Sequence, residues 1–222
     1  MPARKLPTLL LTRPRPDSQR FADMVPGFAA IISPILRIVP VDHDAARLHA
    51  AEGLVFTSGH AIASAGPGRG RPALCVGPRT AELARQAGFD VTEGATGEAS
   101  GLLPLIAASD RRLIHPHGRH VARELPVEGV VVYDQQPLPL TAQAQDLLAG
   151  TDVVLLPLFS PRSAMLLSRA VRHATAPLWI AGISRAAIDA WDGPAARTRI
   201  AARPDACGLV GAIRRLTGTE PC

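Results

Sequence analysis

The stretch of sequence that decides the fold class is residues 153–163, VVLLPLFSPRS, where a short apolar run ends in a turn of hydroxyl and basic residues. Apolar residues at helical spacing follow at once, over residues 161–171. A short apolar strand followed by a helix is the unit from which parallel α/β sheets are built. The alternation recurs along the whole chain, so we expect an α/β protein. The runs typical of strands are residues 8–12, 30–33, 54–57, 73–76, 89–91, 113–115, 130–133, 153–156, 178–181 and 199–201.

An internal repeat divides this alternation into two halves. Four short segments recur in the same order, each 103 to 107 residues further along the chain. Self-similarity of this kind indicates a duplicated structural unit. The ten predicted strands therefore divide into two sheets of five. The matching pairs are residues 10–13 with 113–116, 56–58 with 159–161, 76–81 with 181–186, and 100–102 with 207–209.

Two extended segments interrupt the alternation. Residues 31–41 and 130–140 are rich in β-branched residues, contain proline and leave no room for a helix. Proline in such runs suits edge strands or crossings between domains. If both are crossings, two doubly wound parallel-sheet domains are joined by a two-stranded β linker with an open cleft between them. The predicted parts are a discontinuous α/β domain of residues 1–33 and 140–222, an inserted α/β domain of residues 40–130, and linkers at about 34–39 and 131–139.

Composition narrows the class of protein. The chain has 222 residues, of which 47% are hydrophobic, which excludes a disordered chain. No apolar run reaches the roughly 18–20 residues that a membrane-spanning helix needs. Three cysteines, an odd number spread far apart, indicate no disulfide framework. We expect a soluble, cytoplasmic protein with no membrane contact, and a monomer because no long apolar helix is left exposed.

The basic residues are almost all arginine. Of the 24 basic residues only Lys5 is a lysine, and the net charge is +5. Two explanations of the preference for arginine stay open. One is codon usage in a GC-rich genome, and the other is a need for bidentate bonds to carboxylates or phosphates. The arginines are scattered and aromatic residues make up only 4% of the chain, too few for a base-stacking surface. We therefore expect no nucleic-acid partner.

The residues that follow the predicted strands point to an anionic ligand. In open parallel sheets, ligands bind beyond the carboxyl ends of the strands, where helix N-termini offer N–H groups. Hydroxyl residues, glycine and arginine recur in six such turns, and carboxylates are absent from them. Taken singly, each hydroxyl is explained as a helix cap, which contributes about 1 kcal/mol. Arginine in five turns instead indicates a ligand with several acidic groups. The candidate binding residues are Thr12, Arg13, Thr57, Ser58, Arg79, Thr80, Gly118, Arg119, Ser160, Arg162, Ser163 and Ser184.

Signatures of cofactors and of other catalytic classes are missing. Residues 66–71, GPGRGR, do not link a strand to a helix as a dinucleotide site requires, and we expect a disordered turn there. His115, His117 and His120 lie close in sequence, but no carboxylate or thiol stands near them and the last two are expected beyond the strand. No nucleophile-elbow motif for a serine hydrolase occurs. The sequence predicts neither a metal nor an organic cofactor.

Tyr133 is the only tyrosine in the chain. Tyrosine in a strand is usually a half-buried packing residue. This one lies in the predicted second linker, where its hydroxyl would face the cleft. A phenol with a pKa near 10 can donate a proton to a leaving group. Tyr133 is therefore the candidate catalytic residue.

Taken in order, these residues resemble the uroporphyrinogen-III synthase family over nearly the whole chain. No single motif is diagnostic, but the ordered set, the length and the duplication together are specific. The segments that carry the resemblance are residues 10–14, 54–58, 76–81, 116–118, 131–133 and 159–161, and the turn at Gly182.

The resemblance implies two flavodoxin-like domains and a reaction without cofactors. The family's substrate is hydroxymethylbilane, a linear tetrapyrrole with eight carboxylates. Loss of its terminal hydroxyl gives an azafulvene, which attacks ring D to form a spiro-pyrrolenine, and reclosure with ring D inverted gives uroporphyrinogen III. Hydroxymethylbilane synthase, the deaminase that makes this substrate, is the protein partner that the resemblance suggests.

By position, Tyr133 matches the family's linker tyrosine, and the hydroxyls of Thr80, Ser58, Ser160 and Ser184 match residues that line the cleft. The arginines would then meet substrate carboxylates. The chain departs from the family at residues 182–185, GISR, where arginine replaces a hydroxyl residue, and at His117, where arginine often stands. A hinged two-domain module that binds an anionic small molecule without consuming it is the alternative.

Overall fold

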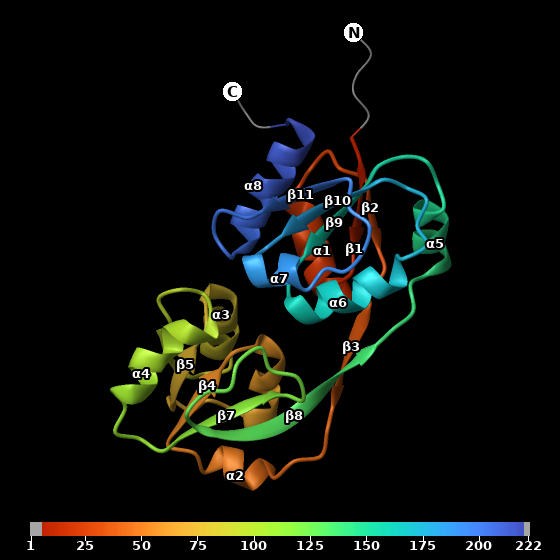
Figure 1. Cartoon of the computed structure of the whole chain (residues 1–222). Helices are drawn as coiled ribbons and strands as arrows, with labels where there is room; N and C mark the ends of the chain where they lie inside the picture. The colour runs from red at the N-terminus through yellow and green to blue at the C-terminus, as the bar shows by residue number, and fades with distance from the viewer. Residues whose placement is uncertain (1–5, 220–222) are drawn as a thin grey trace. The chain divides into compact units, whose positions relative to one another are not determined.

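The computed structural model describes residues 6–219, which fold around two β-sheets (Figure 1). One unit contains the chain up to Arg37 and from Pro137 onward, and the other is Ile38–Gln136. The chain passes between the units twice, once in β3 (Leu36–Pro40) and once in β8 (Glu128–Pro137). Each unit is described by itself below.

The first unit holds a five-stranded parallel sheet in the order β2-β1-β9-β10-β11. Counted along the chain within the unit, this order is 2-1-3-4-5. The strands are β1 (Thr8–Leu11), β2 (Ala30–Ile32), β9 (Val154–Leu158), β10 (Leu178–Gly182) and β11 (Arg197–Ile200), and the helices are α1 (Arg15–Asp23), α5 (Ala142–Leu148), α6 (Pro161–Ala170), α7 (Arg185–Asp189) and α8 (Ala206–Thr217).

Both faces of this sheet are buried because successive side chains of a strand point to opposite faces. Leu10 and Leu156 pack with residues of α5, α6 and α7, whereas Leu9 and Leu155 pack with residues of α1 and α8. Continuous apolar strands such as β9 follow from this double covering.

The second unit holds a six-stranded sheet in the order β3-β8-β7-β4-β5-β6. The pairings among the last five strands are parallel. Backbone hydrogen bonds from Val41 to Val132 and from Leu138 to Ile35 show that β3 runs antiparallel to β8. The other strands are β4 (Gly53–Phe56), β5 (Pro72–Cys75), β6 (Asp90–Glu93) and β7 (Leu113–Gly118), and the helical segments are α2 (Ala45–His49), η1 (Gly59–Ala65), α3 (Pro78–Gln86), η2 (Ala99–Leu102) and α4 (Leu103–Ala107).

The predicted internal repeat is confirmed in the topology. In the repeat, β1 is equivalent to β7, β9 to β4 and β10 to β5. These strands occupy the same positions in the orders β2-β1-β9-β10-β11 and β8-β7-β4-β5-β6. The second sheet has six strands rather than the predicted five because the extended segment after residue 35 pairs with β8 as β3.

Two local predictions were wrong. His117 lies within β7, which continues to Gly118, and not beyond its end. Residues 66–71 form a fixed turn because the five N–H groups of a guanidinium can each find an acceptor. The side chain of Arg71 donates to the backbone carbonyls of residues 48, 49, 65, 67 and 68. A side chain at Gly68 would overlap the backbone of Gly88, so this close approach requires glycine.

No helix among residues 6–219 is both long and apolar enough to cross a bilayer.

Candidate active site

In the first unit, the candidate residues gather at the carboxyl ends of three neighbouring strands. Thr12 follows β1, Ser160 follows β9 and Ser184 follows β10, and these strands are adjacent in the sheet. Two of the hydroxyls cap helices: the Ser160 Oγ accepts from the backbone N–H of Ser163 at 3.2 Å, and the Ser184 Oγ accepts from that of Ala187 at 3.3 Å. The structure thus shows the capping role of Ser160 and Ser184.

Arg13, Arg162 and Ser163 lie at the same edge. Arg162 and Ser163 are in the first turn of α6, where the Ser163 Oγ donates to the Ser160 carbonyl at 3.0 Å. Arg13 forms an ion pair with Asp17 at 3.4 Å, and its guanidinium lies over the ring of Phe159. The structure therefore brings the first unit's predicted residues together.

In the second unit, the corresponding residues follow β7, β4 and β5, which are also neighbours. Gly118 ends β7, Thr57 and Ser58 follow β4, and Arg79 and Thr80 lie in the first turn of α3 after β5. The Arg79 guanidinium forms an exposed ion pair with Glu82 at 2.7 Å. An anionic ligand that binds Arg79 would compete with Glu82.

A β-bulge sets the direction of Tyr133. In the pairing of β7 with β8, His117 lies opposite Val131, but Gly118 lies opposite Tyr133, so Val132 is the extra residue. An extra residue moves the following side chains to the opposite face of a strand. The bulge therefore places Tyr133 on the face that carries Gly118.

The aromatic ring of Tyr133 lies directly on Gly118. A Cβ atom built on Gly118 would be 2.5 Å from Cε2 and 2.9 Å from the hydroxyl oxygen of Tyr133, so a side chain there would force the ring to move. Tyr133 is only 5% exposed and belongs to the core of the second unit. The ring is therefore fixed by packing, with its hydroxyl close to Gly118.

Sequence reasoning missed three contributors to these edges. The ring of His60 meets that of Tyr133 edge-on, with centroids 5.9 Å apart. Asp134 lies 3.6 Å from Arg119 and 3.9 Å from His120, and Asp17 pairs with Arg13. The turn residues carry no carboxylate, as the sequence predicts, but the prediction that no carboxylate lies near the histidines was wrong, because Asp134 of β8 approaches His120.

Thr57 is held by a buried histidine. The Thr57 hydroxyl and the His115 Nε2 are 2.9 Å apart, and His115 is 4% exposed. Burial, and then the nearby His117, lower the pKa of His115 from 6.5 to about 4. The imidazole is therefore neutral near pH 7 and orients the Thr57 side chain.

Cys75 ends β5, the strand that precedes Arg79 and Thr80, but its side chain is buried. Burial, and then Glu93, raise the pKa of the Cys75 thiol to about 12, so it is a poor nucleophile. Among residues 6–219, no group of three or more His, Cys, Asp or Glu side chains could hold a metal ion.

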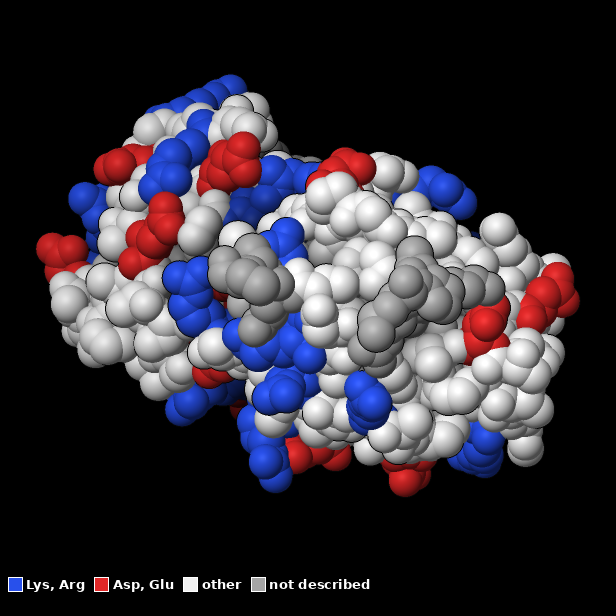
Figure 2. All heavy atoms as spheres, turned by 90° about the horizontal axis from the view of Figure 1, so that it is seen from above, with Lys and Arg blue, Asp and Glu red and all other residues white. Residues whose placement is uncertain are grey.

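Figure 2 shows the basic side chains in several groups with acidic side chains between them.

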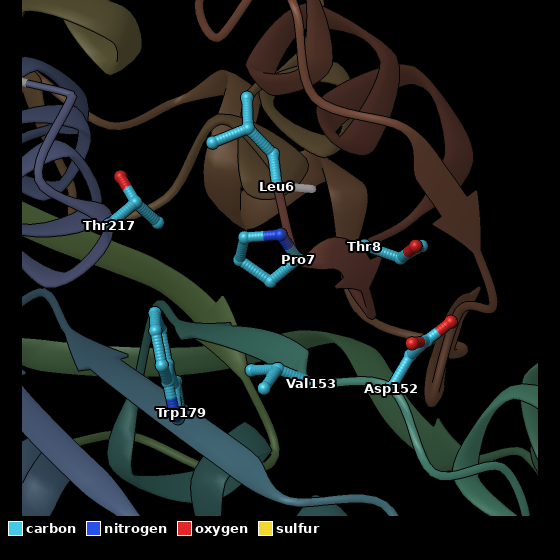
Figure 3. A pocket seen from close by; sticks show the side chains of 7 residues that line it. All are labelled: Leu6, Pro7, Thr8, Asp152, Val153, Trp179 and Thr217. Atoms are coloured by element: carbon cyan, nitrogen blue, oxygen red, sulfur yellow. The ribbon is translucent and has the colours of Figure 1, made fainter. Parts of the chain in front are cut away.

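A hollow of about 190 Å³ in the first unit lies elsewhere (Figure 3). Thr8 begins β1 and Val153 precedes β9, so the hollow opens at the amino-terminal ends of these strands. The candidate residues lie at the carboxyl ends. Its lining residues are Leu6, Pro7, Thr8, Asp152, Val153, Trp179 and Thr217.

Comparison with known proteins gives a family and a fold. The family model described as Uroporphyrinogen-III synthase HemD matches residues 25–211. The uroporphyrinogen-III synthetase of Helicobacter pylori is similar in structure, with a TM-score of 0.62 and 16% identity over 95% of this chain and 100% of that chain. A mutant uroporphyrinogen III synthase of the extremely thermophilic bacterium Thermus thermophilus gives a TM-score of 0.54 and 15% identity over 96% of this chain and 100% of that chain. No curated protein matches the sequence.

We predict that Gly118→Ala destabilises the second unit by about 1–3 kcal/mol, because the added methyl group forces the Tyr133 ring to move. Far-UV circular dichroism follows both units during urea unfolding. Tryptophan fluorescence follows only the first unit, which holds both tryptophans, Trp179 and Trp191. A loss of stability seen by circular dichroism but not by fluorescence therefore belongs to the second unit. A sample with isotope-labelled tyrosine gives the NMR signals of one ring only, that of Tyr133, and these signals should shift in Gly118→Ala.

Gly211→Ala is the matched control, since Gly211 lies within α8 and an added Cβ meets only ordinary contacts there. It should stabilise the first unit by about 0.5–1 kcal/mol. An unchanged tyrosine signal and unchanged stability in Gly118→Ala would contradict the described contact.

We predict that the second unit loses stability as the pH falls from about 6.5 to about 4. His115 has a lowered pKa in the folded state, so the unfolded chain binds the proton first and the loss is on the order of 3 kcal/mol. His115→Asn keeps a polar partner for Thr57 but does not titrate. Urea unfolding at pH 4.5 and pH 7 should show a smaller difference in this variant, and an equal difference would exclude His115 as the source.

Proposed function

The chain belongs to the uroporphyrinogen-III synthase family, enzymes of tetrapyrrole biosynthesis, and we propose that it converts hydroxymethylbilane to uroporphyrinogen III with loss of water. The observation that supports this reaction most directly is the pair of donor-bearing sheet edges. Each combines hydroxyls, helix N-termini and arginines, which suits a substrate with eight carboxylates.

The proposal treats the two units as flavodoxin-like lobes. The first unit's strand order, 2-1-3-4-5, is the flavodoxin-like order, in which ligands bind at the carboxyl ends of the strands. The lobes are residues 1–33 with 140–222 and residues 40–130, and the stretches in and around β3 and β8 serve as the linker. The division of the contacts near residues 37 and 137 supports these boundaries. The substrate then contacts the carboxyl edges of both sheets.

Substrate carboxylates are held by two kinds of group. Helices α1, α3 and α6 each have nine or ten residues and begin at these edges, so their N-terminal N–H groups favour anions. The side chains of Arg13, Arg79, Arg119 and Arg162 add charge-assisted bonds. Many separate contacts of this kind fold a flexible chain into one conformation.

Tyr133 is proposed to donate a proton to the departing hydroxyl. The phenol protonates the hydroxyl as the carbon–oxygen bond breaks, water leaves, and the pyrrole nitrogen supplies the electron pair that forms the azafulvene. A proton released when the macrocycle regains its aromatic pyrroles restores the phenol. Neither step requires a metal or an organic cofactor.

The outcome of ring closure depends on positioning. The azafulvene carbon attacks the substituted carbon of ring D, and the spiro-pyrrolenine then fragments and recloses with ring D inverted. Spontaneous closure instead gives uroporphyrinogen I. The protein therefore acts chiefly by proximity and orientation, which bring the two ends of the substrate together on one carbon.

The direct test supplies the purified chain with freshly generated hydroxymethylbilane and separates the product isomers after oxidation. The proposal predicts type III product at a rate above that of spontaneous closure. Type I product alone would overturn it. Binding of the substrate without any faster consumption would favour the anion-binding module.

We predict that Tyr133→Phe lowers kcat by about tenfold or more, since positioned proton donors contribute about 10²–10⁴-fold in general and this leaving group departs easily. The ring is kept, so its packing on Gly118 and the unfolding transition should be unchanged. Thr198→Val is the control because it removes a hydroxyl from the exposed edge strand β11. Equal kcat in Tyr133→Phe and the native chain would return Tyr133 to a packing role.

A further inference from the structure

Arg13 and Phe159 are brought together by the register of two parallel strands. Thr8 of β1 lies opposite Val154 of β9, and Leu9 lies opposite Leu155. Continued past the ends of the strands, this register places Arg13 beside Phe159. The guanidinium carbon of Arg13 lies 4.7 Å from the centroid of the Phe159 ring.

Phe159 is itself held by the core. Its ring meets that of Phe21 edge-on, with centroids 4.9 Å apart and an interplanar angle of 89°. Phe21 is 2% exposed and belongs to the cluster between the sheet and helices α1 and α8. The ring under Arg13 is therefore a fixed surface.

The rest of Arg13 is restrained as well. The Ser18 hydroxyl donates to the backbone carbonyl of Arg13 at 2.9 Å, and Asp17 lies 3.4 Å from the guanidinium. Asp17 also pairs with Arg20, so one carboxylate faces two cations and the group keeps a positive charge. The Arg13 side chain remains 36% exposed, which allows a ligand to reach it.

A stacked guanidinium suits recognition of a carboxylate. The guanidinium carbon lies over the ring, and the N–H groups of a guanidinium held in this way can bind a carboxylate in a bidentate manner. Because the side chain is ordered in advance, less conformational entropy is lost when the ligand binds.

We propose that Phe159 is a positioning residue that holds Arg13 ready for one carboxylate of the substrate. The inference rests on the proposed function and adds to it the contact that fixes one of the binding arginines. Phe159 does not touch the reacting atoms in this account, so its loss should act on binding and not on the chemical step.

The test is a double-mutant cycle of Phe159→Leu and Arg13→Gln, with Phe159→Tyr as the conservative variant. The first readout is the Kd of uroporphyrin I, an unreactive macrocycle with eight carboxylates, measured from its fluorescence. The second is KM against kcat with hydroxymethylbilane.

Phe159→Leu should raise Kd and KM about 2- to 5-fold, as expected for a partly exposed cation–π contact, and should change kcat by less than about twofold. Arg13→Gln should raise both about tenfold or more. Phe159→Tyr should behave like the native chain, and the double variant should match Arg13→Gln alone.

An effect of Phe159→Leu that is equally large in the Arg13→Gln background, or no effect at all, would overturn the inference. So would a native chain that does not bind uroporphyrin I. If the native chain makes no type III product but the binding cycle holds, the proposed function fails while the role of Phe159 stands.

Discussion

The structure depends on one constraint of parallel sheets: neighbouring strands end at the same edge, so the turns that follow them meet there. Residues as far apart in sequence as Arg13 and Ser160 become neighbours because β1 pairs with β9. The same rule places Thr57 near Gly118 in the second unit. Each sheet thereby brings hydroxyl and basic residues from distant parts of the sequence together at one edge.

The two edges have the same order of strands because of the duplication, but their side chains differ. The repeat aligns Thr12 with His115 and Ser160 with Thr57. In the second unit this pair is a neutral histidine bonded to a threonine, and the bulge in β8 adds a phenol. In the first unit the neighbouring positions carry an arginine stacked on phenylalanine. Under the proposed function both edges bind carboxylates, and the second edge also supplies the proton donor.

The sequence predicts the local parts of this arrangement and not the tertiary ones. Strand-to-helix turns were recognisable because capping hydroxyls follow apolar runs, as at Ser160. The pairing of β3 with β8, the stacking of Arg13 on Phe159 and the contact of Asp134 with Arg119 depend on register and on packing between elements. The bulge is of the same kind, since nothing in residues 128–137 alone shows that Val132 is skipped.

The central claim is that an octacarboxylate binds at the carboxyl edges of the two sheets. The most direct measurement records backbone amide shifts by NMR while uroporphyrin I is added to the native chain. The account predicts that the largest shifts fall in the turns after β1, β4, β5, β7, β9 and β10. Shifts concentrated instead around Leu6, Val153 and Trp179, at the opposite edge of the first sheet, would contradict it.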